Sequence, residues 1–182
     1  NGGMNTRYRD NPYGRFGASG TAGVNLEQLF VTPSLAWKPH ADHSIGVGLN
    51  VAYQRFKVNG VPDAAGVESP GADSSTGIGF KLGWMGQVSE QFTLGAMYSA
   101  RVRMGKLGAY SKLLAHSGEF DVPERYGVGI ALRPVEGVVI AADLMRVNWG
   151  DIKSLGNALT DTQAGFGWHS QTISRIDRKS VV

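Results

Sequence analysis

The chain contains no cysteine and no long apolar run, and its charge is nearly balanced. Without cysteine it can form neither a disulfide-stapled secreted module nor a thiolate metal site. A membrane-spanning helix needs about 20 predominantly apolar residues in succession, and no such run occurs. The formal net charge of +3 at pH 7 is spread along 182 residues, so it leaves no basic footprint for a nucleic acid.

Signals for catalysis are also scarce. The histidines at His43, His116 and His169 are scattered and lack the spacing of metal ligands. There is no nucleophile elbow, phosphate loop or arrangement of paired carboxylates. The sequence therefore predicts a protein that is not an enzyme and that needs no cofactor or metal.

What the sequence has in abundance is alternation between apolar and small or polar residues. In residues 43–57 every odd position from Ile45 to Tyr53 is apolar, whereas the even positions carry Ser, Gly, Asn, Ala and Gln. This pattern lasts about ten residues, which is longer than the five or six of a usual strand. It is typical of a strand that crosses a bilayer in a barrel, with its apolar face toward lipid and its polar face toward a lumen.

Similar alternation recurs along the chain. Further strands are predicted at residues 1–8, 24–37, 76–88, 92–104, 125–132, 138–149 and 168–176, with Pro33 as an irregularity in the second of these. Long connections at 9–20, 59–75, 105–122 and 151–165 alternate with short ones at 38–42, 89–91 and 133–137. Up-and-down membrane barrels sort their connections in this way, with long extracellular loops and short periplasmic turns.

The fold class predicted is therefore all-β, an antiparallel up-and-down transmembrane β-barrel to which this chain contributes about eight strands. Trp37, Trp84 and Phe92 fall beside short turns, as an aromatic girdle at the periplasmic interface would. The alternative is that they are ordinary core aromatics of an all-β protein. One helical turn is predicted, at Tyr110 to His116.

Charged residues also fall on both sides of the predicted strands. Lys81, Arg101, Arg103 and Asp143 lie on the polar faces, where they predict either a lumenal salt-bridge network or an arginine that clamps a substrate carboxylate. Arg55 and Lys57 share the parity of the lipid-facing residues but lie at the outer end of their strand. There they could meet lipopolysaccharide phosphates or snorkel to the interface.

Seven segments, in this order and at even spacing, carry a resemblance to a known family. They are NGGMNTRY, VNLEQLFVTPSLAWKP, HSIGVGLNVAYQRFKV, GIGFKLGWMGQVSEQFTLGAMYSARVRM, FDVPERYGVGIALRP, VNWGDI and GFGWHSQTISRI. Together they cover nearly the whole chain. The chain resembles the FadL/TodX family of outer-membrane transporters for long-chain fatty acids and other hydrophobic compounds.

The resemblance implies a fold and a function. The family barrel has fourteen strands and an N-terminal hatch, so residues 1–176 are expected to form part of a barrel without hatch or closing strands. The resemblance implies passive uptake of fatty acids, hydrocarbons or aromatics across the outer membrane of a Gram-negative bacterium, with substrate leaving through a lateral opening. Partners would be that substrate, outer-membrane lipid and lipopolysaccharide, with no nucleic acid, and the full-length protein would be monomeric.

Two features of the family can be placed on this sequence. By order of segments, Asn1, Gly2 and Gly3 correspond to the kink that opens the barrel wall sideways, and paired glycines tolerate such a break. The position at which the family places a basic group beyond its long strand corresponds to 59–60, which is Asn-Gly in this sequence, and Lys57 and Arg55 are the nearest cations. Carboxylate and neutral substrates both stay open. The alternatives from other classes are a structural or adhesive barrel with surface-binding loops and a barrel-borne hydrolase.

The last six residues, Asp177 to Val182, give the first testable prediction. They place consecutive charges where a spanning strand should alternate apolar and small residues, and DRKSVV is also encoded by one reading frame of a common sequencing-adapter oligonucleotide. We expect residues 177–182 to be a non-native tail. Sequencing the locus from intact DNA should show divergence after about Ile176. Further barrel strands in frame after DRKSVV would contradict the prediction.

Overall fold

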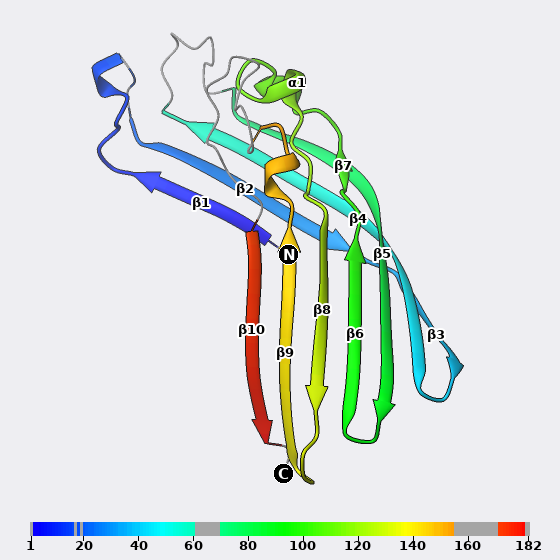
Figure 1. Cartoon of the computed structure of the whole chain (residues 1–182). Helices are drawn as coiled ribbons and strands as arrows, with labels where there is room; N and C mark the ends of the chain where they lie inside the picture. The colour runs from blue at the N-terminus through cyan, green and yellow to red at the C-terminus, as the bar shows by residue number, and fades with distance from the viewer. Residues whose placement is uncertain (1, 17, 19, 61–69, 155–170, 181–182) are drawn as a thin grey trace.

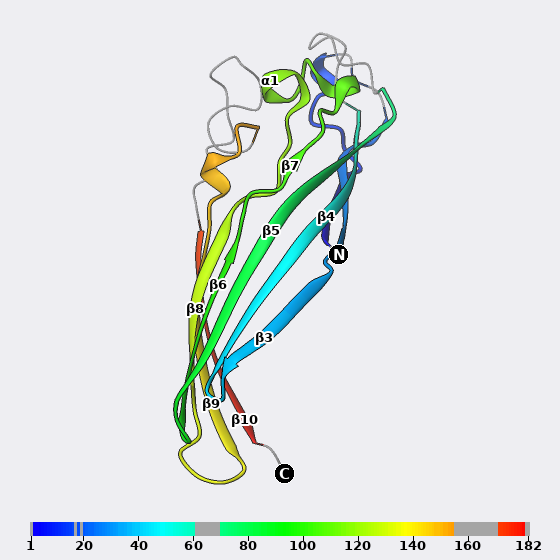
Figure 2. The same cartoon turned by 90° about the vertical axis from the view of Figure 1, so that its right-hand side faces the viewer.

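The computed structural model describes residues 2–16, 18, 20–60, 70–154 and 171–180, and within them the chain forms one curled antiparallel sheet (Figures 1 and 2). Its strands are β1 (Gly2–Tyr8), β2 (Ala22–Val31), β3 (Ser34–His40), β4 (His43–Asn59), β5 (Ala72–Ser89), β6 (Phe92–Ser99), β7 (Arg103–Met104), β8 (Arg125–Leu132), β9 (Val138–Val147) and β10 (Gln171–Ser180). The short helical segments are η1 (Gly14–Phe16), η3 (Gly108–Tyr110), α1 (Ala115–Gly118) and η4 (Trp149–Asp151).

Strand order follows the chain. The path is β1-β2-β4-β5-β6-β8-β9-β10, while β3 lies along β4 and β7 lies along β5. Because β2 and β3 are two pieces of one strand, as are β6 and β7, the ten described strands make eight wall strands, the number predicted. Short turns join β3 to β4, β5 to β6 and β8 to β9 at one end of the sheet. At the other end, called here the long-connection end, lie η1, α1 and η4, which belong to long connections (Figure 1).

The two faces of the sheet differ in character. We call the inner face the one on which the connection between β7 and β8 packs, and the outer face its opposite. Large apolar side chains line up in register on the outer face; Trp37, Ile45 and Trp84 form one such row. The exposed ones are Leu29, Val31, Leu35, Trp37, Ile45, Val47, Leu49, Val51, Tyr53, Ile78, Phe80, Leu82, Trp84, Tyr126, Val128, Ile130, Leu132, Ile140 and Leu144.

The exposed apolar residues form matched rows, and exposure of so much apolar surface to water is energetically unfavourable. In a soluble sheet these side chains would be the core, but here they are solvent-accessible and the small and polar residues lie opposite. A bilayer supplies the apolar environment that such a face needs. The two-faced arrangement predicted from residues 43–57 is confirmed across the sheet.

Pro33 divides the strand predicted at 24–37. β2 pairs with β4 as far as Val31, and β3 resumes the pairing with β4 at Ser34. Pro33 has no N–H to donate, but its carbonyl oxygen accepts a hydrogen bond from the Leu49 N–H at 3.0 Å. The strand is therefore interrupted for two residues and continues along the same neighbour.

The strand predicted at 92–104 is also divided, and here the register changes. Ser99 pairs with Lys81, whereas Met104 pairs with Gly77. The chain thus advances five residues while β5 advances four, which is the signature of a β-bulge. A shift of one residue turns every later side chain to the opposite face.

Gly2 and Gly3 lie in regular pairing with Gln28 and Glu27. The ladder between β1 and β2 is therefore unbroken at these two residues, and Asn1 lies outside the described residues. The lateral opening at Asn1, Gly2 and Gly3 stays a prediction.

At the other end of the chain, β10 extends beyond the predicted strand. Asp177 to Ser180 pair in register with Ala141 to Val138 of β9. The start predicted for this strand, Trp168, lies outside the described residues. Backbone pairing is possible for any sequence without proline, so the non-native origin of 177–182 stays a prediction as well.

The described residues include no helix long and apolar enough to cross a membrane. The helical turn predicted at Tyr110 to His116 is present as two short pieces, η3 and α1, on either side of Ser111–Leu114. α1 contains two residues with left-handed backbone, His116 and Ser117, at φ 50° and 62°. These reverse the chain so that it returns to the sheet.

Adjacent residues on β5 test the assignment of the two faces. Leu82 lies on the outer face, whereas Gly83 lies on the inner face with no atom within 4 Å of the position that a Cβ would take. In the full-length protein, Leu82→Arg should lower the free energy of unfolding in a bilayer by about 2–4 kcal/mol, because its charge would enter hydrocarbon. Gly83→Arg, the matched control, should cost far less in the same titration. Equal losses would contradict the assignment.

Candidate functional site

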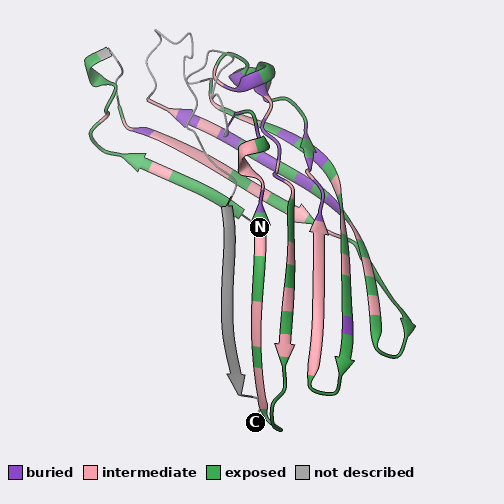
Figure 3. Ribbon diagram, viewed as in Figure 1, coloured by how far each residue is buried: buried purple, intermediate pink, exposed green. Residues whose placement is uncertain are grey.

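The connection between β7 and β8 forms an apolar plug on the inner face near the long-connection end. Phe56 and Val58 of β4 pack against side chains that the connection carries inward, and the buried residues of this plug are Phe56, Val58, Leu107, Tyr110, Leu114, Phe120 and Ile152. Figure 3 shows buried residues concentrated around α1 and along the upper parts of β4 and β5. A loop predicted from its length to be extracellular thus buries many of its side chains inside.

Aromatic contacts and hydrogen bonds hold the plug against the wall. The ring of Tyr110 meets that of Phe56 edge-on at 4.8 Å, and Phe120 stacks on Phe56 at 5.7 Å. The Tyr110 hydroxyl accepts from the Val58 N–H at 2.9 Å and donates to the Gly71 carbonyl. Burial raises the pKa of this hydroxyl, so it stays protonated and able to donate.

An ion-pair cluster fastens the same connection to the β6–β7 strand. The Arg101 guanidinium donates from Nη2 to Glu119 Oε1 at 2.6 Å and from Nε to Asp121 Oδ2 at 2.7 Å. Asp121, whose side chain is 4% exposed, also accepts from the Met104 N–H at 2.8 Å. Both carboxylates belong to the plug connection, and the Arg101 Nη1 also donates to the backbone carbonyl of Asp151, in η4, at 3.4 Å.

The β-bulge explains why the plug can sit so close to β5. Val102 and Met104 would face lipid if the alternation of β6 continued unchanged, but they are buried on the inner face over Gly79 and Gly77. A Cβ at Gly77 would lie 2.4 Å from the Arg103 carbonyl oxygen, so only glycine permits this approach.

The same shift corrects the placement of one predicted lumenal charge. Arg103 lies opposite Ile78 in register, and therefore on the outer face.

Below the plug, the inner face carries a polar row. Asn50 donates from Nδ2 to the Ser99 hydroxyl at 3.3 Å and accepts from the Thr32 hydroxyl at 2.9 Å. Lys81 and Arg125 flank Ser99 on the two neighbouring strands. Their charges are near enough to repel each other, and neither has a carboxylate partner among the residues that the structure describes. Such a pair can attract an anion.

Nearer the short turns, the inner face alternates methionine with glycine. Gly83, Met97, Gly127 and Met145 form one row across four strands, and Met85 lies beside Gly95 in the next. Methionine is apolar, flexible and polarisable, and it contacts aromatic rings favourably. By register, all five methionines of the chain lie on the inner face; the remaining two are Met4 and Met104.

The other predicted site residues take the following places. Asp143 lies on the inner face with its carboxylate over Gly129, as predicted, and is opposite Arg175 in the backbone register. Arg55 and Lys57 lie on the outer face, where Arg55 approaches Glu27 at 3.6 Å. In the described ranges there is no cluster of three or more His, Cys, Asp or Glu able to hold a metal ion.

Most residues of the plug, and Arg125, are not among the site residues predicted from the sequence. The alternation of apolar residues identifies wall strands, but Leu107, Tyr110 and Phe120 lie in a segment without a regular period. Arg125 is the first residue of its strand, and its parity with Gly127 and Gly129 is the signal that indicates the inner face.

An apolar outer face, an inner face of small and polar residues, and connections sorted by length define a segment of an up-and-down transmembrane barrel. The chain belongs to the family described as outer membrane protein transport protein (OMPP1/FadL/TodX), whose profile matches residues 1–174. It is therefore a protein of the outer membrane of Gram-negative bacteria.

Solved structures share this fold at low sequence identity. The CymD monoaromatic hydrocarbon channel has 13% identity and a TM-score of 0.67, with 99% of this chain and 59% of that chain covered. The Pseudomonas putida toluene transporter TodX has 17% identity and a TM-score of 0.64, with 83% of this chain and 50% of that chain covered. The Ralstonia pickettii toluene transporter TbuX has 16% identity and a TM-score of 0.63, with 87% of this chain and 53% of that chain covered. The chain thus spans about half the length of these relatives. No curated protein sequence matches it.

The ion-pair cluster predicts how firmly the plug is held. In the full-length protein, Arg101→Met should leave the buried Asp121 without its cation, which favours local opening of the connection. Trypsin should then cleave after the exposed Lys106 and Lys112 about tenfold faster, equivalent to about 1.4 kcal/mol of local stability. Arg133→Met, which removes one hydrogen bond at the short-turn end, serves as control. Unchanged cleavage in Arg101→Met would show that the plug does not depend on this cluster.

Proposed function

We propose that the protein containing this chain lets hydrophobic small molecules pass passively across the outer membrane, and that the described sheet forms about half of its channel wall. The observation that carries the proposal is the inner face, where methionine rows offer an adaptable apolar surface inside a wall whose outer face already satisfies the lipid. Cargo moves down its gradient, so the function needs no cofactor. Membership of a transport family supports this conclusion.

The cargo proposed includes both neutral compounds and hydrophobic acids. The methionine rows suit an aromatic or aliphatic body, whereas Lys81 and Arg125 supply two cations that a carboxylate can approach. Arg101 is a poor candidate for the predicted carboxylate clamp because Glu119 and Asp121 already occupy its guanidinium. Arg103 is a poor candidate because it lies on the outer face.

The route would run along the inner face and leave sideways at Asn1, Gly2 and Gly3. Since the plug blocks part of the inner face at the long-connection end, cargo entering there must pass beside it. An adhesive barrel would instead present residues 105–122 to the surroundings, and their largest apolar side chains point inward. We propose a monomer, because the exposed apolar rows of the described outer face suit contact with lipid.

Uptake by the full-length protein tests the proposal. In the outer membrane of a strain without other hydrophobic channels, Met97→Gln combined with Met145→Gln should slow entry of a neutral aromatic hydrocarbon about tenfold. Each amide holds water that the cargo must displace, at a cost of about 0.5–2 kcal/mol. Met97→Leu with Met145→Leu is the matched control and should transport normally. Glutamine variants that transport at the wild-type rate would refute the route.

The same assay with a hydrophobic carboxylic acid reports on the two cations. Lys81→Gln with Arg125→Gln should slow the acid about tenfold and leave the neutral hydrocarbon unchanged, because only the acid meets the lost charges. Equal effects on both cargoes would mean that the cations shape the lumen without binding the carboxylate.

A further inference from the structure

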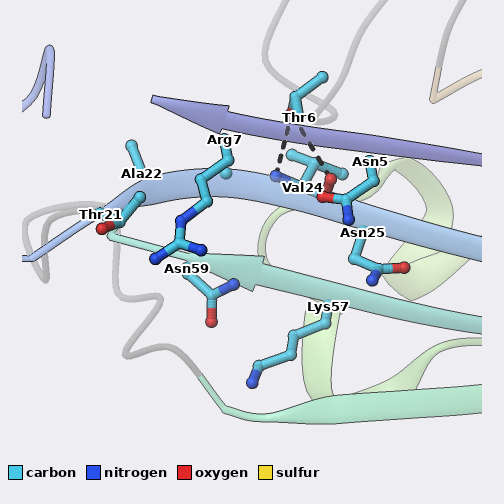
Figure 4. A pocket seen from close by; sticks show the side chains of 10 residues that line it. Asn5, Thr6, Arg7, Thr21, Ala22, Val24, Asn25, Lys57 and Asn59 are labelled. Atoms are coloured by element: carbon cyan, nitrogen blue, oxygen red, sulfur yellow. Dashed lines mark hydrogen bonds between the residues drawn. The ribbon is translucent and has the colours of Figure 1, made fainter. Parts of the chain in front are cut away.

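A polar hollow of about 460 Å³ lies on the outer face at the long-connection end of β1, β2 and β4 (Figure 4). Two rows of the sheet build it. Asn5, Asn25 and Lys57 form one row, and Arg7, Gly23 and Asn59 form the next. The hollow therefore combines a guanidinium, an ammonium and three amide side chains from three adjacent strands.

The absence of a side chain at Gly23 shapes this hollow. Figure 4 shows the Arg7 side chain reaching from β1 across β2 toward Asn59. Gly23 is the residue of β2 that pairs with Arg7 in the register. Lys57 extends from β4 on the same side. A Cβ at residue 23 would collide with the Thr6 carbonyl oxygen, so a larger residue there would force β1 away from β2 and disturb the hollow.

Arg7 and Lys57 also differ from their neighbour Arg55 in their charge partners. Arg55 has Glu27 at 3.6 Å. Within the described part of the chain, neither Arg7 nor Lys57 has a carboxylate within ion-pair distance. Two uncompensated cations beside hydrogen-bonding amides form a site for an anion with several acceptor oxygens.

The height of the hollow identifies which anion it meets. Along β4 the outer face is apolar as far as Val51, then carries Tyr53, and then Arg55 and Lys57. An exposed tyrosine at this point suits the membrane–water boundary. Lys57 lies about 9 Å above it for a strand tilted by about 45°, which is the depth of the headgroups.

We propose that this hollow binds a phosphate group of lipopolysaccharide in the outer leaflet. The inference rests on the membrane placement that the proposed function uses, but on none of the lumenal residues. Arg7 would bind two phosphate oxygens through its guanidinium, Lys57 would contribute a point charge, and Asn25 and Asn59 would donate from their amides. The acyl chains would then lie along Leu29, Val31 and Val51 below.

Lipid binding to the purified full-length protein tests this. Native mass spectrometry should detect bound lipid A carrying both phosphates, and Arg7→Gln with Lys57→Gln should weaken its binding about tenfold or more. Lys38→Gln with Arg133→Gln removes the same charge from exposed positions near the short turns and should bind as the wild type does. Lipid A stripped of its phosphates should bind equally weakly to all three proteins.

Several results would overturn the proposal. One is an equal loss in the control variant, which would reflect net charge alone. Another is a difference in affinity for phosphate-free lipid A between the wild type and the variant with Arg7→Gln and Lys57→Gln. A third is binding of inorganic phosphate alone with the same dependence on Arg7 and Lys57 and with displacement of lipid A, which would make the hollow a site for a soluble anion.

Uptake of the neutral hydrocarbon separates this inference from the proposed function. Arg7→Gln with Lys57→Gln should leave that uptake unchanged, because both residues lie outside the lumen. If the wild-type protein binds lipid A but carries no cargo, the proposed function fails and the phosphate site stands. If it carries cargo but the double variant retains full lipid binding, the phosphate site fails alone.

Discussion

Pairing of backbone polar groups is the constraint on which this structure depends. In hydrocarbon an unpaired N–H or C=O costs several kcal/mol, so each wall strand must bond to its neighbours along the membrane-spanning length. Continuous pairing fixes the alternation of side chains, and alternation separates a lipid-facing from a lumen-facing surface. Even Pro33, which cannot donate, keeps its carbonyl oxygen bonded to Leu49.

Side chains on the lumen-facing surface do not contact lipid, so they differ more in chemical character along the barrel than those on the outer face. Glycine and methionine share it near the short turns, ions and amides occupy its middle, and the plug fills it near the long connections. The plug in turn depends on side chains of the wall, since Phe56 lies between Tyr110 and Phe120. Arg101 joins the plug to the wall electrostatically, so the two parts cannot be considered separately.

The sequence predicted the wall well because the wall repeats. Residues 43–57 alone define which face meets lipid, and matched rows extend that assignment to the neighbouring strands. The plug was not predictable in the same way, because Leu107, Tyr110 and Phe120 find their partners across the sheet and no period links them. The inner-face prediction for Arg103 was wrong because of the β-bulge. The register shift depends on how residues 100–102 cross β5, and the alternation of side chains within the strand does not predict it.

The β-bulge between Ser99 and Arg103 changes which residues of the alternating pattern face lipid, odd-numbered or even-numbered. Before the bulge, even-numbered residues of this strand face lipid; after it, odd-numbered residues do. Loss or gain of one residue at 100–102 would leave composition and hydropathy almost unchanged, yet it would exchange Met104 with Arg103 and direct the plug outward. For alignment and for design, residue count at this point therefore matters more than residue identity.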